Sequence, residues 1–235
     1  MKRSANRILT THVGSLIRPP KLLDFIRAQQ EGRVVDEKAY DQCLKESVSE
    51  VVKRQAQAGL DIINDGEFGK ATSWSLYALN RLSGFEKRPI QPGADPFARG
   101  EDRKRFREFY EELEKPNECS WSNATRHDVV CVSPIAYSGL GELQRDIENF
   151  KAALGGVKAE EAFLPVAAPS SAIPDRKNEY YRNEEELLVA LAEALRTEYK
   201  TIVDNGFLLQ VETRAPRLPT IAWCRHPVLK ITTGG

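Results

Sequence analysis

The sequence predicts an α/β fold built around a parallel sheet. Short apolar runs typical of buried strands alternate with amphipathic helical stretches, which is the pattern of a parallel α/β architecture. Two units also share one layout, in which a glycine, a buried strand and a glutamate follow a helix, at 59–67 and at 206–212. We favour a (β/α)8 TIM-type barrel, which takes about 250 residues and eight strands. About five β/α units are recognisable in these 235 residues, so we expect an incomplete barrel with one exposed parallel edge.

The N-terminal part is predicted to contain two strands and three helices. Residues 8–13 form an apolar first strand that ends at Gly14–Ser15, and residues 60–63 form a short buried strand with β-branched side chains. Asp36 is placed to cap the helix that follows it. Apolar positions at helical spacing predict helices over residues 20–31, 37–58 and 73–82.

From residue 84 to about residue 128 the composition changes to proline, glycine and charged residues. Within this stretch, apolar positions at i, i+3, i+4 and i+7 predict an amphipathic helix over residues 102–115. We interpret residues 84–128 as one long excursion over the end of the barrel or sheet. It is either a lid or entry wall for a site, or a surface insertion with no role.

The C-terminal part continues the alternation of strands and helices. Asn183 is expected to cap a helix whose first turn carries three glutamates, where negative charge is favourable. Strands are predicted over residues 129–132, 162–168 and 207–211, and helices over residues 143–154 and 184–204.

The predicted domain therefore covers residues 1–212, and residues 213–235 form an atypical tail. The tail is rich in arginine, proline and threonine and has no helical periodicity, so it does not resemble the helix that a barrel needs next. Our hypothesis is that it comes from a truncated, mis-spliced or frame-shifted reading. The alternative is a natural disordered tail.

Composition and charge exclude several classes of protein. The formal net charge is zero and the pI is near 6.9, which argues against a nucleic-acid footprint or a polybasic membrane patch. No apolar run approaches the roughly 20 residues that span a bilayer, and the N-terminus lacks the apolar core of a secretory signal. The four cysteines are Cys43, Cys119, Cys131 and Cys224. They are far apart in the sequence and predict neither a zinc ribbon nor a disulfide framework, so we expect a reducing, cytoplasmic setting.

Two carboxylates flank a turn glycine at Asp65-Gly66-Glu67, directly after the strand predicted at 60–63. In α/β barrels and open α/β sheets the carboxyl ends of the strands carry the chemistry. A carboxylate there can bind an ammonium group, act as a base or ligate a metal. The alternative is an ordinary solvated turn, since Asp-Gly is a common turn dipeptide.

Three motifs together resemble one enzyme family. Thr10-Thr11-His12-Val13-Gly14-Ser15 with Arg18-Pro19 comes first, Gly59 to Phe68 (GLDIINDGEF) follows, and Asp204 to Glu212 (DNGFLLQVE) comes last. In this order and spacing they resemble the cobalamin-independent methionine synthases. They are most similar to the single-barrel proteins that correspond to the C-terminal catalytic domain of that family. The resemblance extends from Ile8 to about Glu212.

The resemblance implies zinc-dependent transfer of a methyl group from 5-methyltetrahydrofolate to homocysteine, giving methionine. Zinc binds the substrate thiol and lowers its pKa, so that a thiolate attacks. By resemblance, Gly14 and Ser15 hold the substrate carboxylate and Glu67 holds its ammonium group. Glu212 is a second ammonium partner, where the family has aspartate, and Thr213-Arg214 replaces the acid and proline that follow it in the family.

The zinc ligands that the resemblance implies are a His-x-Cys pair, a glutamate and a second cysteine, on strands beyond the end of this chain. Cys224-Arg225-His226 has two of these residue types in the reverse order. His12 is expected to be packed or to line the mouth of the site, and His127 to be structural. Without zinc, a thiol keeps its free pKa of about 8.5 and attacks poorly at neutral pH, which argues against activity of this chain by itself.

Three other interpretations stay open. Single-barrel members can alkylate another thiol, such as coenzyme M. The chain can also be a non-catalytic binding or interaction protein that pairs, through its open sheet edge, with itself or with a full-length relative. A uroporphyrinogen-decarboxylase-like barrel shares the architecture and predicts several arginines for porphyrin carboxylates in the first loop, where Arg18 stands alone.

Overall fold

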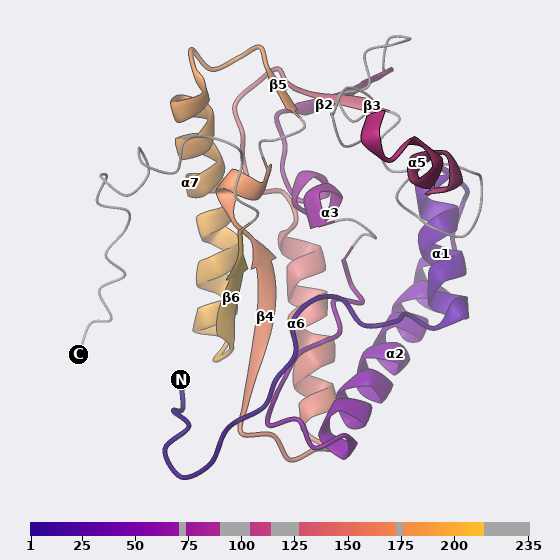
Figure 1. Cartoon of the computed structure of the whole chain (residues 1–235), viewed down its shortest axis with the longest axis vertical. Coiled ribbons are helices and arrows are strands. Elements are labelled where there is room, and N and C mark those ends of the chain that lie inside the picture. The colour runs from indigo at the N-terminus through magenta and orange to yellow at the C-terminus, as the bar shows by residue number, and fades with distance from the viewer. Residues whose placement is uncertain (71–73, 90–103, 114–126, 173–175, 214–235) are drawn as a thin grey trace.

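The computed structural model describes residues 1–70, 74–89, 104–113, 127–172 and 176–213, which form an α/β fold (Figure 1). Its elements, in chain order, are α1 (Pro20–Gln30), α2 (Glu37–Gln57), β1 (Ile62–Ile63), α3 (Trp74–Asn80), β2 (Phe85–Pro89), α5 (Arg107–Leu113), β3 (His127–Cys131), α6 (Leu140–Leu154), β4 (Glu161–Ala167), the 3-10 helix η2 (Pro169–Ala172), β5 (Arg176–Asn178), α7 (Glu184–Asp204) and β6 (Leu208–Glu212).

The described strands form two sheets of three strands each. The first has the order β1-β4-β6 and is entirely parallel, with Ile62 opposite Glu161 and Ala167 opposite Glu212. In the second, β3 lies between β2 and β5, antiparallel to β2 and parallel to β5. The carboxyl ends of β1, β4 and β6 therefore share one edge of the first sheet, where the strand-end residues of three separate units can meet.

The main hydrophobic core lies between the first sheet and helices α1, α2, α6 and α7. Figure 1 shows α7 beside β6, and α6 beside β4 on the side away from α7. Phe150 of α6 stacks on Phe207 at the start of β6, with ring centroids 4.9 Å apart. The helices begin where the sequence predicts, because Asp36 accepts the N–H groups of Lys38 and Ala39, and Asn183 accepts the N–H of Glu186.

The structure confirms an α/β fold, the strand positions near 60–63, 162–168 and 207–211, and the main helices. The prediction of a strand at residues 8–13 is wrong, since this exposed segment has no strand assignment. Thr10 O instead accepts two N–H bonds, from Asp61 and Ile62, each at 3.0 Å. Two backbone bonds to a single carbonyl hold the segment beside β1 without forming a ladder.

The expectation of wholly parallel pairing also needs correction. Consecutive strands usually neighbour one another, but β1 pairs directly with β4 while β3 lies in the second sheet. There β3 pairs antiparallel with β2, a strand that the sequence did not predict and that lies at the start of the 84–128 excursion. β5 and η2 were also not predicted. The lid role of residues 84–128 and closure of a barrel stay predictions, and residues 214–235 lie outside the described part.

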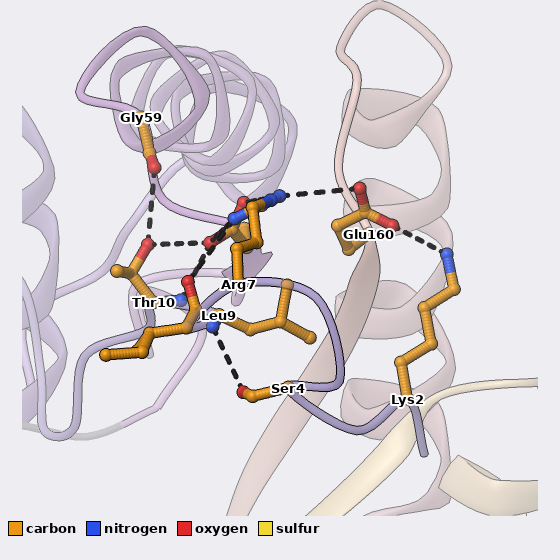
Figure 2. Close-up of polar contacts among 9 residues, drawn as sticks. Lys2, Ser4, Arg7, Leu9, Thr10, Gly59 and Glu160 are labelled. Carbon is orange, nitrogen blue, oxygen red and sulfur yellow. Dashed lines mark hydrogen bonds and ion pairs between the residues drawn. The ribbon is translucent and has the colours of Figure 1, made fainter.

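The N-terminal segment is fixed to the amino ends of β1 and β4 (Figure 2). Arg7 donates to both carboxylate oxygens of Asp61, at 2.8 and 2.6 Å, and the N–H and hydroxyl of Thr10 donate to the same carboxylate. Figure 2 shows Lys2 and Arg7 directed at Glu160. The Arg7 bonds hold the pKa of Asp61 well below its usual range. Asp61 is therefore the acceptor that anchors the N-terminal segment to the start of β1.

No helix in the described ranges is long and apolar enough to cross a membrane. The cytoplasmic setting stays a prediction.

We expect Asp61→Ala to release the N-terminal segment, because it removes the acceptor for Arg7 and Thr10. Hydrogen–deuterium exchange followed by mass spectrometry should show faster exchange over residues 7–18. Glu160→Ala is the matched control in the same network, since it removes the outer ion pairs and keeps Asp61. Equal exchange of residues 7–18 in both variants would show that Asp61 does not anchor the segment.

Candidate functional site

The turn after β1 consists of two successive Asx turns. The side-chain oxygen Oδ1 of Asn64 accepts the N–H of Gly66 at 2.8 Å, and Oδ1 of Asp65 accepts the N–H of Glu67 at 2.9 Å. Asn64, Asp65 and Glu67 are all buried. Glu67 has a φ of 60°, and it is the one non-glycine residue in the described part with a positive φ. Such backbone strain is concentrated at functional sites.

The side chain of Gln55, in α2, is hydrogen-bonded to the first residue of this turn. Its side-chain amide accepts the N–H of Asn64 at 3.0 Å and donates to the carbonyl of Asn64 at 2.7 Å. The Nε2 atom of His12 lies 3.1 Å from Oε1 of the same amide. His12 is thus a packed side chain, in agreement with the expectation from the sequence. The amide of Gln55 therefore fixes the position at which the carboxylates follow the strand.

The Glu67 carboxylate is held on one oxygen only. Ser15 Oγ donates to Glu67 Oε2 at 2.8 Å, whereas Glu67 Oε1 is buried and has no hydrogen-bond partner among the described residues. The backbone of the turn is held as well, since Leu16 N–H donates to Gly66 O and Arg18 Nη2 donates to Glu67 O. Gly14, with a φ of 89°, turns the chain into this contact.

A cavity of about 80 Å³ lies at the carboxyl end of the first sheet. Two of the predicted site residues, Glu67 and Glu212, line it, while Gly14 and Ser15 are not part of the lining. The structure thus brings together the acids of the two similar units in the sequence. The cavity lining consists of Glu67, Lys70, Tyr77, Pro165, Val166, Ala167, Ser171 and Glu212.

The end of β4 forms one wall of this cavity and is held by several hydrogen bonds. Ala167 N–H donates to the Tyr77 hydroxyl at 2.8 Å, and Ala167 O accepts the Tyr199 hydroxyl at 2.6 Å. Glu212 O accepts the N–H of Ala168 at 2.9 Å and the Ser171 hydroxyl at 3.2 Å. Burial raises the pKa of Tyr77 and Tyr199, so both hydroxyls keep their protons at neutral pH.

A buried ion-pair cluster lies next to Tyr77, one of the cavity-lining residues. Arg81, at the end of α3, pairs with Asp146 of α6 and with Glu198 of α7, the latter at 2.9 Å. Burial by itself lowers the pKa of Arg81, and the two carboxylates raise it above its ordinary value. Burial raises the pKa of Glu198. Buried acids outnumber buried bases in the described part, which favours a cationic ligand. The buried acids are Asp65, Glu67, Asp146 and Glu198, and the buried bases are Lys70 and Arg81.

Sequence reasoning did not identify Lys70, Tyr77 or Ser171 as residues of the site. Lys70 is 7% exposed, its ammonium group donates to Pro165 O, and its Nζ lies 4.7 Å from the Tyr77 ring centroid. The sequence offers one signal for Lys70, which is its position only three residues after Glu67. Tyr77 and Ser171 follow strand ends, but nothing in the sequence shows that they meet.

The described residues do not fit the zinc site that the resemblance implies. No group of three or more histidine, cysteine, aspartate or glutamate side chains within the described ranges could hold a metal ion. Cys43 and Cys131 are each buried, in different hydrophobic clusters. Cys224 and His226 lie outside the described residues. We therefore assign no step of a reaction to zinc.

The chain is similar to archaeal methionine synthases. It is 23% identical to the methionine synthase of Thermococcus kodakarensis over 197 residues, which are 84% of this chain and 49% of that protein. It is 24% identical to the methionine synthase of Saccharolobus solfataricus over 217 residues, or 91% of this chain and 55% of that protein. The chain spans about half the length of the curated relatives it matches. No family model matches the chain.

Solved bacterial structures share the fold. A putative vitamin-B12 independent methionine synthase from Listeria monocytogenes superposes with a TM-score of 0.56 at 20% identity, over 88% of this chain and 52% of that one. A B12-independent methionine synthase from Shewanella sp. W3-18-1, in complex with selenomethionine, gives a TM-score of 0.50 at 14% identity, over 76% and 43% of the two chains. With the curated relatives, these structures confirm the resemblance expected from the motifs.

Asp65 should make stability depend on pH. Burial raises the pKa of Asp65 from 3.8 to about 6. The folded protein therefore binds this proton more tightly than the unfolded chain, and the contribution of Asp65 to the free energy of unfolding falls as pH rises through this interval, by about 3 kcal/mol. Asp65→Asn removes this pH-dependent loss of stability, because the side chain no longer titrates. Its amide oxygen can still accept the Glu67 N–H.

Urea denaturation at a series of pH values checks this effect. The stability of Asp65→Asn relative to the wild type should increase by about 2 kcal/mol between about pH 4 and pH 7. Asp41→Asn, at a half-exposed position on α2, is the matched control and should show no such increase. A stability difference for Asp65→Asn that does not vary with pH would show that the carboxyl group is not perturbed.

Proposed function

We propose that this chain, a relative of the cobalamin-independent methionine synthases, binds the amino-acid part of a homocysteine-type thiol in the cavity at the ends of β1, β4 and β6. The observation that carries the proposal is the buried Glu67 carboxylate, which has one oxygen fixed by Ser15 and the other without a described partner. A buried acceptor left unsatisfied is costly. A substrate ammonium group would satisfy it.

Glu212 supports the same assignment from the other unit. It lines the cavity with Glu67, and it lies at the end of β6, opposite Ala167 of β4. Glutamate is one methylene longer than the aspartate that the resemblance leads us to expect, and the cavity still includes it. Two acids around one small space suit an ammonium group, which can donate three hydrogen bonds.

The proposed reaction is transfer of a methyl group from 5-methyltetrahydrofolate to the thiol of homocysteine, which gives methionine. The bond from the methyl carbon to N5 of the folate breaks, and a bond from this carbon to sulfur forms. N5 keeps the electron pair and takes up one proton, which balances the proton that the thiol loses. Zinc stays a prediction from the resemblance, and no step is assigned to it here. The proposed task of the described residues is to bind and orient the amino acid, with Ser15 holding Glu67 in place.

Other thiols fit the cavity less well. Coenzyme M carries a sulfonate and no ammonium group, so it would leave the buried Glu67 carboxylate without a partner. The interaction-protein alternative also stays open, because β6 pairs with β4 on one side and no other described strand pairs with it. Association through this edge, with a second copy or with a full-length relative, stays a prediction.

The test of the proposed function is binding of L-homocysteine, measured by isothermal titration calorimetry in the presence of a reductant. Glu67→Gln keeps the size of the side chain and removes its charge. Because a hydrogen bond to a charged group contributes about 1.5 to 3 kcal/mol, we expect binding to weaken about 10- to 100-fold. Glu193→Gln, at an exposed position on α7, is the matched control and should bind as the wild type does. Unchanged affinity in Glu67→Gln would refute the role of Glu67.

A further inference from the structure

We propose that two copies of this chain associate through both edges of the first sheet and close one barrel of eight parallel segments. In this dimer the N-terminal segment (residues 7–18) of each copy lies beside β6 of the other copy. The dimer is independent of the ligand in the proposed function, because it depends on the strand direction, the exposed side chains and the charge of the two sheet edges.

The first sheet has a fourth parallel member, which forms no regular ladder. At the amino end of β1, Thr10 O accepts the N–H groups of Asp61 and Ile62. At the carboxyl end, Leu16 N–H donates to Gly66 O, so the N-terminal segment runs in the same direction as β1. With β1, β4 and β6 it gives a row of four parallel segments. Four is half of the eight strands that close a barrel of this class.

Both outer edges of this row are open among the described residues. β6 pairs with β4, and no second described strand pairs with β6. The outer side of the N-terminal segment has no partner among the described strands either. Figure 1 shows β6 on one side of β4 and the indigo N-terminal segment on the other. An open edge presents N–H and C=O groups that can pair with another chain.

Exposed apolar side chains lie on one face of the N-terminal segment. Residues 11–18 alternate between exposed and half-buried, as a strand with one covered face does. The exposed set includes Val13 and Ile17, which are 72% and 95% exposed. The ring of His12 lies against the ring of Phe163, with centroids 6.5 Å apart. Val13 and Ile17 therefore lie on the face of the sheet opposite to Phe163.

Val211 is an exposed apolar residue at the β6 edge, and it lies on this same face. It is 46% exposed and is in register with Val166, which belongs to the main hydrophobic core on the helix side of the sheet. Phe163 precedes Val166 by three residues and faces the other way, because successive strand residues alternate. Pairing of the two edges would thus bring Val211 of one copy close to Val13 and Ile17 of the other.

The charges of the two edges are complementary, which selects a second copy as the partner. Residues 1–18 contain four basic residues and no acidic residue, whereas the α7–β6 unit (residues 184–212) contains seven acidic and two basic residues. Ion pairs within each copy, such as Arg7 with Asp61 and Lys200 with Asp204, leave these signs unchanged. Contact between two β6 edges would instead join two acidic units, and like charges oppose association.

Two-fold symmetry allows the two junctions to close. Each junction joins the N-terminal segment of one copy to β6 of the other, and a two-fold axis along the barrel generates the second junction from the first. All eight segments then run in one direction, as in a closed parallel barrel. The carboxyl ends of both sheets lie at one mouth, so the two cavities lined by Glu67 and Glu212 share it.

The test is the mass of the full chain in solution, measured by size-exclusion chromatography with light scattering over a range of concentrations. The wild type should elute with about twice the mass of the 26.4 kDa chain. Val13→Glu and Val211→Lys each place a charge in both junctions, so each variant alone should elute as a monomer. Val34→Lys, at a fully exposed position between α1 and α2, is the matched control and should stay dimeric.

Mixing the two edge variants tests which edges meet. In a mixed dimer of Val13→Glu with Val211→Lys, one junction is unchanged and the other sets the introduced acid against the introduced lysine. The mixture should therefore recover the dimer, with one copy of each variant. Circular dichroism establishes that every variant is folded, and Ile17→Glu, at the same edge, takes the place of Val13→Glu if that variant does not fold.

Several results would overturn the dimer. A wild type that stays monomeric over the whole range would refute it, and so would a dimer that both edge variants keep. Dissociation by only one edge variant, or a mixture that stays monomeric, would show that the N-terminal segment and β6 do not meet. A mass above that of two copies would show an open chain in place of a closed barrel. Homocysteine binding and its loss in Glu67→Gln are measured separately, so the proposed function can stand when the dimer fails.

Discussion

The pairing of the Gln55 side-chain amide with both backbone groups of Asn64 is the contact on which the candidate site depends. It fixes the turn in which Glu67 adopts a positive φ. Such a conformation costs about 1 to 3 kcal/mol and persists where surrounding bonds determine it. Here the Asx bonds of Asn64 and Asp65 supply that restraint. The direction of the Glu67 carboxylate is thus set by contacts that involve no ligand.

The N-terminal segment connects the two ends of β1. At the amino end it bonds to Asp61 through Arg7, and at the carboxyl end Ser15 and Arg18 bond to Glu67. A segment without a regular ladder is held in register by a few side-chain bonds at each end. Strand-end geometry therefore depends on a stretch of chain about 50 residues away in sequence.

Buried charge gives the cavity its chemical character. The Arg81 cluster ties α3 to α6 and α7 and leaves Lys70 outside any ion pair in the described ranges. Replacing buried ion pairs by apolar groups is often neutral or stabilising, so the presence of this cluster does not by itself indicate a gain in stability. Arg81 from this cluster and Lys70 both lie against the ring of Tyr77, whose hydroxyl bonds to the end of β4. The same low-dielectric surroundings strengthen each interaction that a zwitterionic ligand would make.

The sequence by itself determined the helices with their Asp36 and Asn183 caps, the α/β class, and the acidic strand ends at Glu67 and Glu212. These features are encoded in local spacing, and local capping bonds and apolar faces decide them. Only the tertiary structure decided that residues 8–13 lie beside β1 without forming a strand, and that β2 pairs with β3. It also decided that Lys70, Tyr77 and Ser171 meet the two glutamates. Pairing and convergence of this kind arise from contacts between distant segments, which no local pattern records.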